Sequence, residues 1–222
     1  MAKLDDWDSS KRSRSEQEGF KDALVTNYQR QGPAHPNGTQ TLICMVVNKP
    51  MHKGRVIASH IAKHEKLAKM KLYGLQETDI NDPRNGLLLA KKIQDAFDVK
   101  HVCFNYDPIH QVFNFRVLNP ALLNDRIYTP DPSLQGDYDY PDTFASLNGQ
   151  PLQLPRDEDR HPLIRPWVRI IGYHARCAHK FARQARWITE EELQNYLAYD
   201  DFVMKSDSPK DFSEFEDYGD DG

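Results

Sequence analysis

The chain has 222 residues, of which 39% are hydrophobic, so it is long enough and apolar enough to bury a core, and wholesale disorder is excluded. Its three cysteines are far apart and form no Cys-x-x-Cys pair, so neither a disulfide framework nor a four-cysteine zinc site is expected. No apolar run approaches the roughly 20 residues that span a bilayer, and the N-terminus lacks the apolar centre of a signal peptide, so we expect a cytoplasmic or nuclear protein with no membrane partner.

The formal charge of −4 is unevenly distributed along the chain. Residues 200–222 hold nine acidic residues and two lysines, a charge of −7, which leaves +3 for the rest of the chain. A mildly basic body is compatible with binding nucleic acid, and an acidic tail would then screen or compete with that polyanion. The simpler interpretation of the tail is a solvated, disordered terminus.

The first half of the chain contains one amphipathic helix and two strands. The helix is predicted because Phe20, Leu24 and Tyr28 recur at every fourth position. The two strands are rich in β-forming residues and are joined by a segment with Pro and Gly, so they are expected to pair as a hairpin. In chain order the predicted elements are a disordered N-terminus at 1–14, a helix at 16–29, strands at 41–47 and 55–61, and a lysine-rich helix at 62–72.

The second half continues with a helix, two further strands and a helical end. Leu89, Ile93 and Phe97 are spaced by four, which predicts a helix, and Thr189 with Glu192 has the capping-box pattern that starts one. The predicted elements are a turn-rich connection at 74–85, a helix at 87–98, strands at 101–106 and 111–118, an irregular segment at 119–160, and helices at 162–188 and 190–199. Together they predict an α+β fold in a single domain at 15–199, with a core at 41–118, a helical part at 160–199 and the disordered tail at 200–222.

Four polar residues are placed in an order that suits phosphodiester hydrolysis. That reaction needs a base for the attacking water and a cation for the developing charge. His60, at the end of a predicted strand, suits the base, and Asn85 is expected to orient its ring. Gln94 and Asp98 are four residues apart on a predicted helix, so they share a face and can hold one ion. Asp98 supplies a hard oxygen ligand, whereas Gln94 offers a neutral carbonyl oxygen.

Each of these residues has a plainer interpretation when it is taken alone. A His at a strand end is usually a hydrogen-bonded surface residue, and an Asn-Gly pair is usually a turn. Two polar residues on one helix usually form a solvated face. Only their joint order and spacing favours a catalytic site.

Two groups of basic residues are predicted to contact the phosphates of nucleic acid. The first group follows His60 directly. The second group lies together on the predicted helix at 162–188, away from its apolar face. The alternative is that both are ordinary solvated faces. The residues are Lys63, Lys66 and Lys69 in the first group, and Arg169, Arg176, Lys180 and Arg183 in the second.

The order of these parts resembles the HNH endonuclease domain proteins of filamentous fungi. The matching segments, in chain order, are Phe20-Lys-Asp-Ala-Leu24, Cys44-Met-Val-Val47, Ala58-Ser-His60-Ile61, Asn85-Gly-Leu-Leu-Leu89 and Ile93-Gln-Asp-Ala-Phe-Asp98. The resemblance implies a ββα-metal finger with an additional hairpin and flanking helices. It implies His60 as general base, Asn85 as the residue that orients it, and Asp98 with residue 94 as ligands of Mg²⁺, Mn²⁺ or Zn²⁺. The chain departs from the pattern at Gln94, where the family has a histidine.

Three functional hypotheses follow from these residues. The first is a metal-dependent HNH-type endonuclease that hydrolyses DNA, with double-stranded DNA as its partner. The second is a catalytically degenerate HNH-like module that binds nucleic acid or a protein, and Gln94 motivates it. The third is an interaction protein whose acidic, aromatic tail at 200–222 recruits a protein partner.

Overall fold

The computed structural model describes residues 14–35, 37–63, 75–130, 133, 138–155 and 165–206. Three antiparallel strand pairs and several helices make up this part of the chain, so the fold is α+β, as predicted. The helices are α1 (Arg14–Asn27), α3 (Lys91–Asp98), α4 (Phe144–Leu147), α5 (Val168–Gln184) and α6 (Glu190–Ser206). The strands are β1 (Thr41–Ile43), β2 (Pro50–His52), β3 (Val56–His60), β4 (Gly86–Ala90), β5 (Val102–Asp107) and β6 (Val112–Val117).

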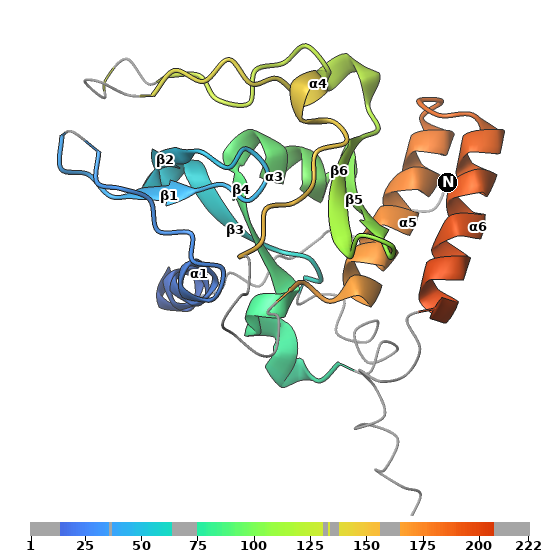
Figure 1. Ribbon diagram of the computed structural model, residues 1–222, viewed down its shortest axis with the longest axis horizontal. Helices are drawn as coiled ribbons and strands as arrows, with labels where there is room; N and C mark the ends of the chain where they lie inside the picture. Colours follow the sequence, from blue (N-terminus) through green and yellow to red (C-terminus); the bar gives the residue numbers. More distant parts are fainter. Residues whose placement is uncertain are drawn as a thin grey trace, which may run out of the picture.

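The elements are arranged around a central hairpin and helix (Figure 1). Strands β3 and β4 pair with each other, and α3 packs against both of them. Helix α1 covers the β3–β4 pair on one side, while the β5–β6 hairpin lies between α3 and α5 on the other. Helix α6 packs on the outer side of α5. We call β3, β4 and α3 together the ββα unit.

The strand pairing differs from the predicted hairpin of 41–47 with 55–61. Strand β1 pairs instead with β2, which lies in the segment expected to be a loop, and β3 pairs with β4. Strand β4 occupies the beginning of the predicted helix at 87–98, so the helix starts only at Lys91. All five residues of β4 are buried, and a continuous apolar run of that kind suits a strand covered on both faces. An α-helix over the same residues would have turned one of the three leucines towards solvent.

Gly86 is the residue that lets α1 approach the ββα unit closely. A Cβ atom placed there would lie 2.4 Å from Phe20 Cζ and 2.8 Å from Leu24 Cδ2. Phe20 and Leu24 are both buried in the core, so room for that Cβ requires their side chains to shift within it. The close packing of α1 on β4 therefore depends on glycine, which has no side chain, at the first residue of β4.

Gly86→Ala is expected to lower the free energy of unfolding by about 1–3 kcal/mol, the usual cost of overpacking a core. Gly19 is the matched control, because it lies on the exposed face of α1 and nothing stands within 4 Å of a Cβ placed there. Gly19→Ala is expected to raise the free energy of unfolding by roughly 0.5–1 kcal/mol through helix propensity. Urea unfolding of both variants checks the pair, and an equal effect of the two would contradict this packing.

The β5–β6 hairpin and the two C-terminal helices were predicted more accurately. Strands β5 and β6 lie where the pattern placed them, and the Thr189–Glu192 capping box is confirmed by two reciprocal bonds of 2.7 and 3.1 Å. Helix α6 continues to Ser206 instead of ending near 199. Asp200 is buried and ion-paired with Arg176 at 2.7 Å, so the predicted tail does not begin at this residue.

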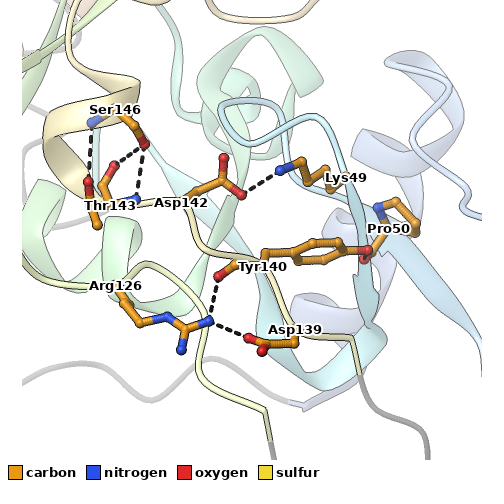
Figure 2. Close-up of polar contacts among 8 residues, drawn as sticks. All are labelled: Lys49, Pro50, Arg126, Asp139, Tyr140, Asp142, Thr143 and Ser146. Carbon is orange, nitrogen blue, oxygen red and sulfur yellow. Dashed lines mark hydrogen bonds and ion pairs between the residues drawn. The ribbon is translucent and has the colours of Figure 1, made fainter.

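An irregular segment before α4 is fastened to the β1–β2 hairpin (Figure 2). Tyr140 donates its hydroxyl hydrogen to the Pro50 carbonyl at 2.7 Å, and Lys49 pairs with Asp142 at 2.6 Å. Arg126 binds the Tyr140 carbonyl at 2.9 Å and also contacts the Asp139 carboxylate. Each of these polar groups has a partner within the cluster, so these contacts hold the segment against the β1–β2 hairpin.

Several predictions fall on residues that the structure does not describe. They are the disordered N-terminus at 1–13, most of the lysine-rich helix at 62–72 and the tail from 207 onwards. Among the helices of the described ranges, none has the length and apolar character needed to cross a bilayer.

Candidate active site

The ββα unit brings the last residues of β3 and α3 to the same end of the β3–β4 pair. Strand β4 runs antiparallel to β3, from Gly86 opposite His60 to Ala90 opposite Val56. Helix α3 follows β4 directly and packs back along the pair, so its last residue, Asp98, returns towards the end where β3 finishes. Lys63 shows this closeness, because it lies three residues after His60 and its Nζ is 2.9 Å from Asp98 Oδ2.

The contacts of His60 include a stacked ring and a hydrogen bond. Its ring lies on that of Phe20, with centroids 3.7 Å apart and planes inclined by 17°. Its Nε2 is 3.2 Å from Asn81 Oδ1, and an amide oxygen can only accept. The hydrogen of the neutral ring is therefore on Nε2, which makes Nδ1 the basic nitrogen.

Asn81 thus contacts the imidazole, and the sequence pattern did not indicate this contact. It ends the short 3₁₀ helix η3 (Glu77–Asn81), in the same turn-rich segment as Asn85. Two asparagines four residues apart are equivalent signals in a sequence. Only the course of the two short 3₁₀ helices, η3 and η4 (Pro83–Asn85), decides which one reaches His60.

The predicted contact of Asn85 with the imidazole is replaced by a different role. Asn85 is fully buried, and its Oδ1 accepts from the Ala62 amide at 2.9 Å. Its Nδ2 donates to the carbonyls of Ala62 at 3.0 Å and Ile80 at 2.9 Å. The backbone carbonyl of Asn85 also accepts from Ile61 N at 2.9 Å. Asn85 therefore clamps the segment that follows His60.

Asp98 and Gln94 touch each other, as their four-residue spacing predicts. Gln94 Nε2 donates to Asp98 Oδ2 at 2.7 Å, the same oxygen that Lys63 approaches. The other oxygen, Oδ1, is buried and has no hydrogen-bond partner among the described residues. A carboxylate in the last turn of a helix also lies beside the negative end of the helix dipole. The carboxylate of Asp98 and the end of the helix dipole thus both attract a cation to this position.

Residues 42–105 match a family model described as HNH endonuclease.

The matched region begins in β1 and ends in β5, so it contains the whole ββα unit. It includes His60, Asn85, Gln94 and Asp98, while α1, α5 and α6 lie outside it. The match supports an HNH domain in this part of the chain and indicates a nuclease-type function with a nucleic acid as substrate. Neither the curated proteins nor the solved structures contain a match to the chain.

HNH endonucleases generally use divalent metal ions, and some donors within the matched residues 42–105 are of the kind that such ions bind. The buried Asp98 Oδ1 without a hydrogen-bond partner in the described ranges is a ligand atom of the right kind, and the Gln94 amide oxygen is close enough to join it after rotation of the amide. Within those ranges, no group of three or more His, Cys, Asp and Glu side chains is arranged around a metal position. Mg²⁺ and Mn²⁺ keep several waters and need few protein ligands, whereas Zn²⁺ usually takes three or four. The donor set therefore fits Mg²⁺ or Mn²⁺ better than Zn²⁺.

The basic stripe predicted on the helix at 162–188 lies on α5 and contributes to the packing of α5 against α6. Arg176 pairs with Asp200, and Arg183 pairs with Glu190 at 2.8 Å, so both guanidinium groups bind acids of α6. Lys180 is exposed and Arg169 is half-buried. Lys66 and Lys69 lie outside the described residues. The role of this stripe in binding phosphate stays a prediction.

A second pair of reactive residue types, Cys103 and His179, lies between β5 and α5. Cys103 Sγ is 3.9 Å from His179 Nδ1, but that nitrogen donates to the Ala175 carbonyl at 2.9 Å. Burial raises the pKa of the Cys103 thiol and lowers that of His179. The thiol therefore stays protonated, and the pair packs as part of the core.

Proposed function

We propose that this chain is an HNH-type endonuclease that hydrolyses phosphodiester bonds of double-stranded DNA with one divalent ion, Mg²⁺ or Mn²⁺. The observation that carries the proposal is the ββα unit. In it, the strand bearing His60 and the helix bearing Asp98 finish at the same end of the β3–β4 pair. The match of this unit to an HNH endonuclease family supports it. Because a nuclease of this kind gains most affinity from phosphates, it needs little contact with base edges.

The residues of the site divide the work of hydrolysis between them. His60 accepts the proton of the attacking water at Nδ1, while Asn81 at Nε2 and the Phe20 ring keep the imidazole in place. Asp98 and the carbonyl oxygen of Gln94 would hold the divalent ion, which would supply positive charge for the phosphate undergoing hydrolysis. Asn85 keeps the chain after His60 in a fixed path.

Nicking of supercoiled plasmid DNA in Mn²⁺ or Mg²⁺ tests the proposal. The wild-type protein is expected to convert plasmid to the open-circular form, and a chelator is expected to stop it. Asp98→Asn keeps the size of the side chain but removes its charge, so the rate should fall by about 100-fold or more. Nicking that continues unchanged with the chelator and in Asp98→Asn would refute a metal-dependent mechanism at this site.

A second function, a catalytically degenerate HNH-like module that binds nucleic acid or a protein, is favoured by one specific observation. Gln94 turns an N–H donor towards Asp98 where a metal-binding side chain would present a lone pair. A Lys ammonium also lies against the same oxygen. The carboxylate in this arrangement is neutralised by the protein's own groups.

Gln94→His separates the two functions. For an active endonuclease, the imidazole ligand is expected to tighten Mn²⁺ binding by about tenfold or more, in a protein that already binds the ion and nicks DNA. For a degenerate module, the wild type neither binds Mn²⁺ nor nicks, and the variant gains both. Calorimetric titration beside the plasmid assay distinguishes these outcomes.

A further inference from the structure

Lys63 places a positive charge on the cation-attracting residue of the site. Its Nζ lies 2.9 Å from Asp98 Oδ2, and the Lys63 side chain is 42% exposed against 25% for Asp98. Lys63 is therefore the more exposed partner of the pair. A cation bound at Asp98 would stand within a few ångströms of this ammonium group, where like charges repel strongly.

The position of Lys63 is built into the fold through Asn85. Both backbone groups of Ala62, the residue before Lys63, are bound by the buried Asn85 side chain. Ile61 N is bound by the Asn85 carbonyl. The backbone that carries Lys63 is thus fixed in front of the C-terminal end of α3, while the long side chain keeps its freedom to leave.

We infer that Lys63 is an internal competitor for the divalent ion at Asp98, so that its ammonium group must leave Asp98 before the ion binds. This inference rests on the proposed function for the identity of the ligand, a divalent cation. It assigns a regulatory role to a residue that the sequence analysis had placed among the phosphate-binding lysines. Metal affinity is then set by the strength of one Lys–Asp pair as well as by the ligands.

Calorimetric titration of the full chain with Mn²⁺, without nucleic acid, tests the inference. Lys63→Met keeps the length of the side chain and removes its charge, so it should tighten Mn²⁺ binding by about tenfold or more, as expected for removing a like charge at this range. The double variant Lys63→Met/Asp98→Asn should lose this gain. Lys91→Met is the matched control, because Lys91 pairs with Asp95 on the same helix at 2.9 Å and should leave the affinity unchanged.

Equal Mn²⁺ affinity of wild type, Lys63→Met and Lys91→Met would overturn the inference. Failure of every variant to bind Mn²⁺ would overturn it too, because Lys63 would then compete with no ion. The proposed function is judged separately by plasmid nicking. Tighter Mn²⁺ binding by Lys63→Met without any nicking would leave the inference standing and remove the endonuclease, whereas nicking with unchanged affinity would do the reverse.

Discussion

His60→Ala is expected to lower the rate of Mn²⁺-dependent nicking of plasmid DNA by about 10²–10⁴-fold, the range typical of losing a positioned general base. The imidazole is fixed by Asn81 and Phe20 so that Nδ1 is its basic nitrogen. Alanine removes that nitrogen and leaves the carboxylate of Asp98 in place. Single-turnover nicking at saturating Mn²⁺ measures the chemical step and separates it from metal binding.

The control for this variant is a histidine outside the ββα unit. His110 is exposed and pairs with Asp107 at 2.7 Å in the β5–β6 hairpin, so His110→Ala should nick at the wild-type rate. Mn²⁺ titration of His60→Ala should give the wild-type affinity, which shows that the site is still folded. Equal nicking rates for wild type and His60→Ala would remove His60 from the mechanism.

Asn85→Ala is expected to lower the free energy of unfolding by about 3–5 kcal/mol, a value typical of breaking a buried hydrogen-bond network. The substitution leaves the Ala62 amide and the carbonyls of Ala62 and Ile80 without their side-chain partner. Desolvated backbone groups without partners are costly, and here three are affected at once. Urea unfolding followed by circular dichroism measures the change.

Asn81→Ala is the matched comparison for Asn85→Ala. Asn81 is exposed and its side chain bonds the His60 ring, so its loss should change the free energy of unfolding by less than about 1 kcal/mol. A similar loss of stability in both variants would show that Asn85 is no more important to the fold than its neighbour. The clamp between Asn85 and the chain after His60 would then be wrong.

The spacing of apolar and polar residues predicted the secondary structure correctly where that spacing fits one kind of element. The spacing of Phe20, Leu24 and Tyr28 located α1, and the four-residue spacing of Gln94 and Asp98 placed their side chains in contact. The pattern failed at Leu87–Leu89, because an apolar run suits a buried strand as well as a helix. The four-residue spacing from Leu89 through Ile93 then extended the helix into β4.

The pairing of the strands and the buried face of α5 depend on tertiary contacts, which a local sequence pattern does not contain. On α5 the buried face runs through Ile171, Ala175, Ala178 and Ala182. His174 donates to the Phe97 carbonyl at the end of α3. Small side chains such as these alanines mark a close helix–sheet contact that hydrophobicity alone underrates.

An anomalous difference map from crystals grown with Mn²⁺ would test the ββα unit as a metal centre most directly. We expect a peak within coordination distance of an Asp98 carboxylate oxygen, with the Lys63 ammonium moved away from Oδ2. A strong peak elsewhere in the molecule, or no peak at Asp98 with Lys63 still paired to it at saturating Mn²⁺, would contradict it.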